Sequence, residues 1–246
     1  QHRDCAVLPQ RPLGKAADEP DLSTEAIRNS IASGESAMAN FVTDAIVSRC
    51  HTLGYDVDFA MIDSSILRSG LEPGGEVHYR DWFNIMPFAD TIRFCRMTGR
   101  ELKALLEDNA RRIDHPDEPN TERGFIHFSR EIRYTVQRGK DRLHNQMVEA
   151  RVNGQPIDDG LDRTYTTAVP NFFRELSAPW EKSVTGENGF IPAAVKEWSC
   201  QDTDLFLRRE MVAYIQEMGG VTKNGGAQRD GRLILLERKA DNNESI

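Results

Sequence analysis

The sequence predicts a mixed α/β fold, in which helices are layered on a mixed β-sheet. Segments with the period of a strand alternate with segments with the period of a helix, but not in the strict strand–helix–strand order of a purely parallel sheet. A hairpin is also expected, because Asn153-Gly154 follows a strand-like segment and both residues tolerate positive φ. The length of 246 residues suits one large domain.

Helical spacing marks three segments. From Glu35 onward, apolar residues recur every three or four positions until Gly54, which predicts an amphipathic helix with one buried face. A second helix follows Gly99, with leucines at the positions that one face would bury. A third helix begins near Leu207 and ends at Gly219.

Strands are expected where apolar residues alternate with polar ones or form short β-branched runs. These segments are residues 57–62, 90–97, 132–136, 148–152, 165–169 and 233–236. Before them, residues 1–34 are expected to form an N-terminal arm: an edge strand at Ala6-Val7-Leu8 and then a loop rich in proline and glycine. Residues 35–239 would form the domain, and residues 240–246 a frayed tail.

Composition excludes some classes of partner. A net charge of −8 and a pI near 5.3 argue against nucleic acid, whose phosphates demand a positive field. No run of 18 apolar residues is present, so we expect a soluble chain without a membrane partner, in an unknown compartment. The four cysteines form no C-x-x-C pair, and Cys50 and Cys95 are expected to be small buried hydrophobes.

Several motifs follow one another along the chain. They are E-S-A-M-A-N-F-V-T-D-A at residues 35–45, G-E-V-H-Y-R-D at 75–81, M-P-F-A-D-T at 86–91, T-G-R-E-L-K-A-L-L-E at 98–107, V-P-N-F-F at 169–173 and D-G-R at 230–232. In this order they resemble the C-terminal, substrate-binding domain of the 5′-nucleotidase family. The resemblance covers most of the chain and implies the layered fold of that domain.

The resemblance also implies a ligand site. In the family, two phenylalanines from the L-P-F and N-F segments hold the nucleoside between them, and these positions are Phe88 and Phe172 here. A family arginine reaches the anionic part of the substrate, and Arg68 occupies its place. The family loop that holds the ribose hydroxyls corresponds to residues 186–190, in which Asn188 replaces an aspartate.

Two departures from the family pattern affect charge. Asp63 stands where the family has an asparagine, and Gly34 stands where it has an arginine. An acid beside the pocket repels a phosphate and favours an amine or a hydroxyl. We therefore expect an aromatic ligand that is less anionic than a nucleotide.

The motifs of the family's hydrolytic domain are absent. Hydrolysis there needs two metal ions held by clusters such as D-x-H and G-N-H-E, and this sequence contains neither cluster. Its six histidines are isolated from one another in sequence. We expect no metal site, no cofactor and no hydrolytic activity of the chain's own.

Two classes of function stay open. As a binding module, the chain would recognise a small aromatic ligand, with a homo-oligomer or a separate catalytic partner left open. As a metal-free enzyme, it would act on an aromatic amine, for example in a Pictet–Spengler-type condensation of tryptophan with an aldehyde. The candidate acids and bases are then Asp63, Glu76 and His78. A metallophosphoesterase domain encoded upstream would favour the module.

Overall fold

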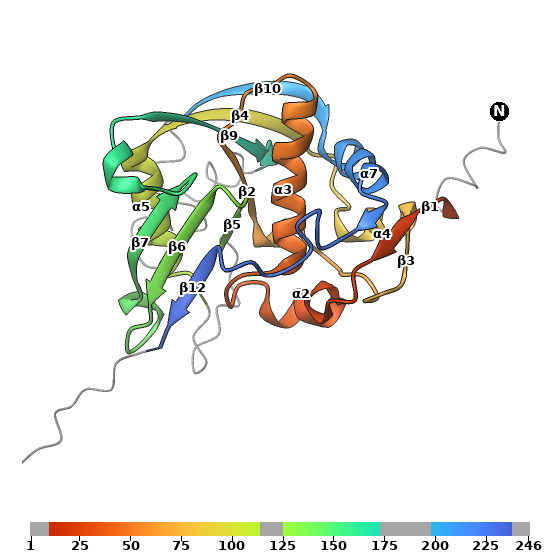
Figure 1. Ribbon diagram of the computed structural model, residues 1–246, viewed down its shortest axis with the longest axis horizontal. Coiled ribbons are helices and arrows are strands. Elements are labelled where there is room, and N and C mark those ends of the chain that lie inside the picture. Colours follow the sequence, from red (N-terminus) through yellow and green to blue (C-terminus); the bar gives the residue numbers. More distant parts are fainter. Residues whose placement is uncertain (1–9, 114–124, 173–197, 238–246) are drawn as a thin grey trace, which may run out of the picture.

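The computed structural model describes residues 10–113, 125–172 and 198–237 (Figure 1). Its central sheet has the strand order β10-β4-β9-β2-β5. These strands are β10 (Ser199–Phe206), β4 (Thr91–Thr98), β9 (Thr164–Pro170), β2 (Phe59–Asp63) and β5 (Ile126–Phe128). Only the β2–β9 pair among them is parallel, so the sheet is mixed.

Two smaller sheets flank the central one. One has the order β11-β1-β3, from β11 (Gly220–Val221), β1 (Pro12–Ala16) and β3 (Glu76–His78). The other has the order β12-β6-β7-β8, from β12 (Leu233–Leu236), β6 (Ile132–Gln137), β7 (Gln146–Val152) and β8 (Gln155–Pro156). The expected hairpin is confirmed between β7 and β8, where Asn153 and Gly154 have φ of 50° and 80°.

Five α-helices are described with their side chains. They are α2 (Thr24–Ser30), α3 (Ala37–Thr52), α4 (Tyr79–Ile85), α5 (Gly99–Ala110) and α7 (Leu207–Glu217). The sequence predicts α5 well, because Thr98 and Glu101 form a capping box: the Thr98 backbone N–H donates to Glu101 Oε2 at 2.6 Å and the Glu101 N–H donates to Thr98 Oγ1 at 3.3 Å. Short 3₁₀ helices, among them η3 (Ser64–Ile66), connect the elements.

The central helix α3 is more buried than its sequence predicts. Every residue from Ala37 to Val47 is buried, so the expectation of a single buried face is wrong for this part of the helix. The reason is tertiary, because α3 packs against β2 and β5 on one side and α7 on another (Figure 1). Small residues such as Ala39 and Ala45 permit this close packing.

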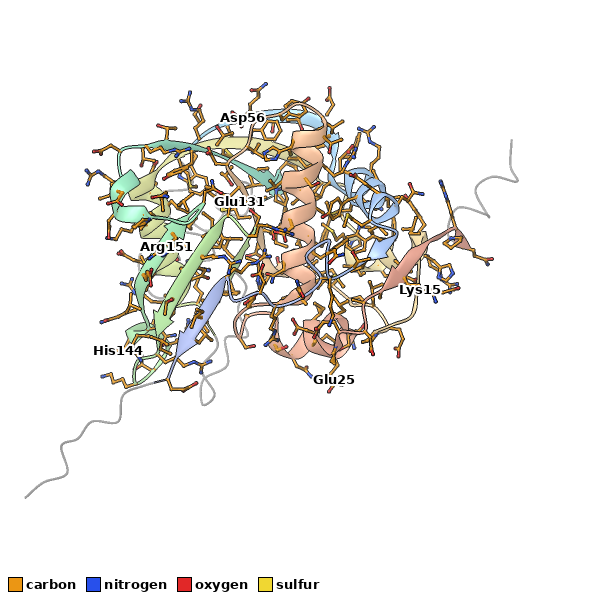
Figure 2. All side chains as sticks on the ribbon, viewed as in Figure 1. Lys15, Glu25, Asp56, Glu131, His144 and Arg151 are labelled. Atoms are coloured by element: carbon orange, nitrogen blue, oxygen red, sulfur yellow. A yellow bond between two sulfur atoms is a disulfide. The ribbon has the colours of Figure 1, made fainter. Side chains whose placement is uncertain are left out.

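The core has two parts, one on each face of the central sheet. Ala60, Ile62 and Ile92 belong to the part that contains α3 and α7, whereas Phe59 and Met61 belong to the part that contains α5 and the β6–β7 pair. This alternation follows from the period of a strand. Charged residues such as Glu25, Asp56 and His144 lie at the outer edges of the molecule (Figure 2).

The N-terminal arm differs from expectation. Ala6-Val7-Leu8, expected as an edge strand, lies outside the described residues. Residues 10–30, expected as a loop, contain β1, which is the middle strand of its sheet, and the helix α2. Leu22 and Ile27 are buried in the same core as α3. The stabilisation from this burial outweighs the local preference of Pro12 and Gly14 for irregular structure.

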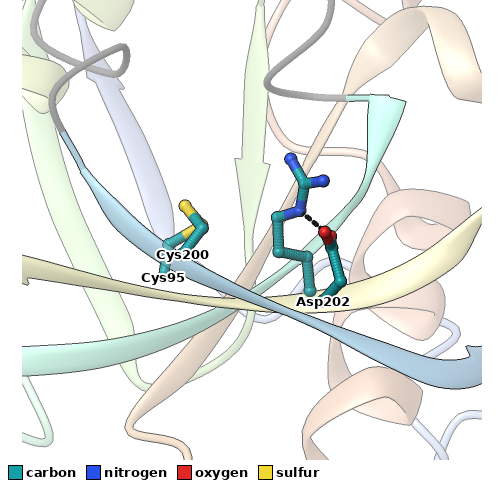
Figure 3. Close-up of a disulfide and its surroundings, with 4 residues drawn as sticks. Cys95, Cys200 and Asp202 are labelled. Carbon is teal, nitrogen blue, oxygen red and sulfur yellow. Dashed lines mark hydrogen bonds and ion pairs between the residues drawn. A yellow bond between two sulfur atoms is a disulfide. The ribbon is translucent and has the colours of Figure 1, made fainter.

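A disulfide joins Cys95 on β4 to Cys200 on β10 (Figure 3). The two cysteines are direct partners in the antiparallel ladder of β4 and β10. Two positions further along the same ladder, Arg93 and Asp202 are also direct partners and form an ion pair. Cys95 is buried, as expected, but it is half of a disulfide, which the sequence did not indicate. Cys50, in contrast, is a buried free thiol, as expected, and burial raises its pKa to about 12.

Candidate functional site

The rings of Phe88 and Phe172 stack on each other. Their centroids are 6.0 Å apart and their planes are inclined by only 10°. The Phe88 side of this pair is open to solvent, since 39% of the residue is exposed, and Phe172 is half-buried. Large apolar rings at this exposure contribute little to a core and are available to a ligand.

The sheet places the two rings together although they are far apart in sequence. Strands β4 and β9 are antiparallel neighbours, with Ile92 opposite Pro170, so the start of β4 meets the end of β9. Asn171 locks this junction: its N–H donates to the Thr91 carbonyl oxygen at 2.9 Å, and its Oδ1 accepts from the Thr91 N–H at 3.3 Å. Phe172 follows Asn171 directly, and Phe88 lies three residues before Thr91.

The separation of the rings sets a condition for binding. Optimal contact between carbon atoms is about 3.5–4.0 Å, so a flat ligand between two rings needs about 7–8 Å from ring to ring. At 6.0 Å the two phenylalanines contact each other instead. A ligand therefore enters only when the rings separate by roughly 1–2 Å.

A hollow of about 260 Å³ lies beside Phe88, near the lower limit of small-molecule sites. Its lining consists of aromatic, charged and small residues, namely Tyr79, Phe88, Ala89, Asp90, Phe206, Arg208, Arg209 and Val212. Phe206 at the end of β10 is 51% exposed. No pattern in the sequence indicates this hollow, because β10 and the start of α7 reach Phe88 only through the fold.

Asp63 and Arg68 lie on either side of η3. The Asp63 side chain is buried, and its Oδ1 accepts the Ser65 backbone N–H at 2.7 Å, so it caps η3. Arg68 is exposed, and its guanidinium donates to the Ser65 carbonyl oxygen at 3.4 Å. Asp63 thus has a structural role at the turn, while the Arg68 side chain is accessible to an anion.

His78 and Glu76 form a separate acid–base group on β3. The His78 Nδ1 lies 3.2 Å from Asp81 Oδ2, and its Nε2 lies 3.7 Å from Glu76 Oε2. Asp63 belongs to the central sheet, whereas Glu76 and His78 belong to the β11-β1-β3 sheet. Tyr79, which follows His78, lines the hollow beside Phe88.

Asn188, expected to contact ligand hydroxyl groups, lies outside the described residues. Within residues 10–113, 125–172 and 198–237, no group of three or more His, Cys, Asp or Glu side chains is arranged to hold a metal ion. Over the same residues, none of the helices has the length and apolar character needed to cross a membrane.

The first and last motifs meet in one buried network away from the rings. The Glu35 carboxylate accepts the side-chain amide of Asn40 at 2.7 Å and the backbone N–H groups of Asp230 and Gly231 at 2.6 and 3.0 Å. Asp44 pairs with Arg232. Burial by itself lowers the pKa of Arg232, but the hydrogen bonds to the carboxylates of Asp230 and Asp44 outweigh it, so the pKa is raised. These motif residues therefore join α3 to the segment that leads into β12.

Comparison with known proteins agrees with this architecture. The family described as 5′-nucleotidase, C-terminal domain, matches residues 12–177. The trifunctional nucleotide phosphoesterase YfkN of Bacillus subtilis is 24% identical over 155 residues, covering 62% of this chain and 10% of that protein. A 5′-nucleotidase of Vibrio vulnificus is 27% identical over 146 residues, covering 59% of this chain and 23% of that protein.

Solved structures share the fold. The 5′-nucleotidase precursor of Thermus thermophilus superposes with a TM-score of 0.70 at 21% identity, covering 95% of this chain and 41% of that one. The NAD nucleotidase of Haemophilus influenzae gives 0.65 at 16% identity, covering 96% and 40%. The chain thus spans less than half the length of these relatives. Because the family match extends over more than half of the sequence, the chain belongs to the 5′-nucleotidase C-terminal domain family.

Proposed function

We propose that the chain binds a small aromatic molecule, similar to a nucleoside or nucleotide, between Phe88 and Phe172, and that it has no hydrolytic activity of its own. The observation that carries the proposal is the nearly parallel orientation of the two rings at the edge of the sheet. Parallel faces accept a flat ligand whatever the hydrogen-bonding pattern of its edge. The names of the relatives, which are nucleotidases, support a nucleoside-like ligand.

The charge around the rings suits a ligand with a polar or weakly anionic substituent. Arg68 presents an exposed guanidinium, and Arg208 and Arg209 line the hollow beside Phe88. Arg208 is already held against the Phe88 carbonyl oxygen and the Phe83 ring, and Arg209 pairs with Glu210. Asp90 in the same hollow would oppose a full phosphate charge. We therefore place adenosine and tryptophan ahead of AMP as ligands.

Titration calorimetry with adenosine, AMP and tryptophan tests this function. Phe88→Ala and Phe172→Ala should each weaken binding of the preferred ligand by ~1–3 kcal/mol, the value of stacking on one base. Tyr55→Ala is the matched control, because Tyr55 is 40% exposed and also packs on another ring, that of Phe94. Equal affinity in all four proteins, or no binding of any of the three probes, would contradict the proposal.

The absence of hydrolysis is tested separately. The purified chain should release no phosphate from AMP in the presence of Mn²⁺ or Zn²⁺, because its sequence lacks the two-metal motifs. Robust turnover that a chelator abolishes would refute this part of the proposal while leaving the stacking site intact.

A second function is favoured by the acid–base group at His78. Its ring lies between Asp81 and Glu76, and the adjacent Tyr79 reaches the hollow beside Phe88. In a Pictet–Spengler condensation, the amine of tryptophan and an aldehyde form an iminium ion with loss of water. The indole carbon then bonds to the iminium carbon and loses its proton to a base.

Mass spectrometry of the chain incubated with tryptophan and an aldehyde checks this second function. A cyclised product that forms faster than in buffer, and more slowly with His78→Ala, would support it. A rate equal to that in buffer would leave the binding module as the function.

A further inference from the structure

We propose that Arg208 is a positioning residue, which fixes the backbone of Phe88 and so keeps its ring parallel to that of Phe172. This inference rests on the proposed function, because it assigns a part of the same site to a residue outside the family motifs. Arg208 lies in the first turn of α7, more than a hundred positions after Phe88.

The Arg208 side chain has two contacts near the site. Its guanidinium donates to the carbonyl oxygen of Phe88 at 2.7 Å. The same group lies over the ring of Phe83, with 4.4 Å from Cζ to the ring centroid. A cation over an aromatic face is attracted to it, and the contact restricts the side chain to one geometry. Arg208 is therefore held in place to act on the Phe88 peptide group.

The start of α7 holds this segment at a second point. The Leu207 N–H donates to the carbonyl oxygen of Asp90 at 2.9 Å. On the other side, two hydrogen bonds join Thr91 to Asn171, just outside the β4–β9 ladder. Asp90 and Thr91 are thus fixed by hydrogen bonds that no side-chain substitution at position 208 removes.

Phe88 itself lies beyond these fixed points. It precedes Asp90 by two residues, and its neighbours Pro87 and Ala89 are exposed. Among the hydrogen bonds of the described residues, the one from Arg208 is the one that reaches the Phe88 carbonyl oxygen. Without it, the ring could rotate away from the parallel orientation although the sheet stays intact.

The consequence is a loss of preorganisation. When only a fraction of the molecules has a binding-competent site, the apparent dissociation constant rises by the inverse of that fraction. If the parallel orientation falls to about a tenth of the population, affinity for a flat ligand falls about tenfold. A ligand without an aromatic ring should not respond.

Three variants test the proposal. Arg208→Gln removes the charge over Phe83, and Arg208→Lys keeps the charge and N–H donors on a single nitrogen. Arg163→Gln is the matched control, because Arg163 also lies over a ring, that of Tyr165, at 5.0 Å, but near the opposite end of β9. Calorimetry with adenosine and with ribose measures binding, and hydrogen exchange of residues 86–91 measures the order of the segment without a ligand.

The expected result is selective. Arg208→Gln should weaken adenosine binding about tenfold, leave any binding of ribose, which is uncharged and has no aromatic ring, unchanged and speed exchange in residues 86–91 without lowering the melting temperature. Arg208→Lys should recover part of both effects, and Arg163→Gln should match the unmodified chain.

Other results decide against one proposal or the other. If Phe88→Ala weakens adenosine binding but Arg208→Gln does not, the stacking site stands and the role of Arg208 is refuted. If the unmodified chain binds none of adenosine, AMP and tryptophan, the proposed function fails, and exchange in residues 86–91 still decides whether Arg208 orders the segment. Unchanged exchange in Arg208→Gln would overturn the inference.

Discussion

Asp44 and Arg232 form a bidentate ion pair in the interior, although 188 residues separate them in sequence. The two guanidinium nitrogens donate to the two carboxylate oxygens at 3.0 Å each, and both side chains are almost completely buried. Arg130 approaches the same carboxylate from the solvent side, at 2.7 Å. Helix α3 is thereby joined to the segment that leads into β12.

Asp44→Ala should destabilise the fold strongly, because it leaves the Arg232 charge buried without this partner. The expected loss is about 3–5 kcal/mol in the free energy of unfolding, measured with urea at neutral pH. Asp162→Ala is the control, since Asp162 pairs with Arg100 in solvent, and its stability should equal that of the unmodified chain. A loss below about 1 kcal/mol for Asp44→Ala would show that Asp230 alone satisfies Arg232.

Phe88→Ala should leave the melting temperature nearly unchanged, because the residue is 39% exposed and its removal opens no closed cavity. Phe59→Ala, at the start of β2 and fully buried, should cost about 3–5 kcal/mol. Thermal unfolding of the two variants separates a ligand-facing ring from a core ring. A large decrease in melting temperature for Phe88→Ala would mean that the stacked rings of Phe88 and Phe172 stabilise the fold.

Removal of the disulfide should lower stability in oxidising buffer. Cys95 and Cys200 are separated by 105 residues, and their bond restricts the unfolded chain, so Cys95→Ala with Cys200→Ala should cost about 2–4 kcal/mol. A reductant should lower the melting temperature of the unmodified chain and leave that of the double variant unchanged. If both proteins respond equally to the reductant, the bond does not stabilise the fold.

The free energy of unfolding should decrease as the pH is lowered below neutrality, because of His127. Burial lowers its pKa from 6.5 to about 4, with the Ile31 backbone and Asp21 acting in the opposite direction. Between these values the unfolded chain binds a proton that the folded chain does not, so this contribution to stability is complete above pH 6.5 and is lost toward pH 4.

The free energy of unfolding should change by at most about 1.4 kcal/mol per pH unit through this one histidine. His127→Gln should remove that part of the pH dependence, as measured by urea unfolding at pH 7, 6 and 5. His51→Gln, at an exposed position, should retain it. A parallel pH dependence in His127→Gln and the unmodified chain would assign the loss of stability to other groups.

Local patterns in the sequence predict most elements but few of their contacts. Helix α5 is predictable because its capping box and its leucines agree. Strand β10 is not, because it lies at the edge of the sheet with most side chains exposed and has no apolar alternation. Without β10, neither the Cys95–Cys200 bond nor the approach of α7 to Phe88 can be inferred.

The candidate site is predictable to a similar extent. The motifs identify Phe88 and Phe172, whose rings lie together in the structure. They do not identify Arg208, because its contact with Phe88 depends on the path of the chain from β10 into α7. Asp63 is named by its departure from the family pattern, yet its carboxylate caps η3, a role that only the local geometry reveals.

The position of the rings just outside the β4–β9 ladder affects how this architecture can evolve. The paired residues from Ile92 to Thr98 on β4 carry the structural demands of the sheet, and the rings lie beyond the last pair. Substitutions in residues 86–90 can change which molecule fits without breaking a ladder hydrogen bond. The residues that build the sheet and the residues that would contact a ligand can therefore change independently in evolution. Membership of the family thus specifies the scaffold, and the identity of a ligand at the proposed site depends on a few side chains outside the ladder.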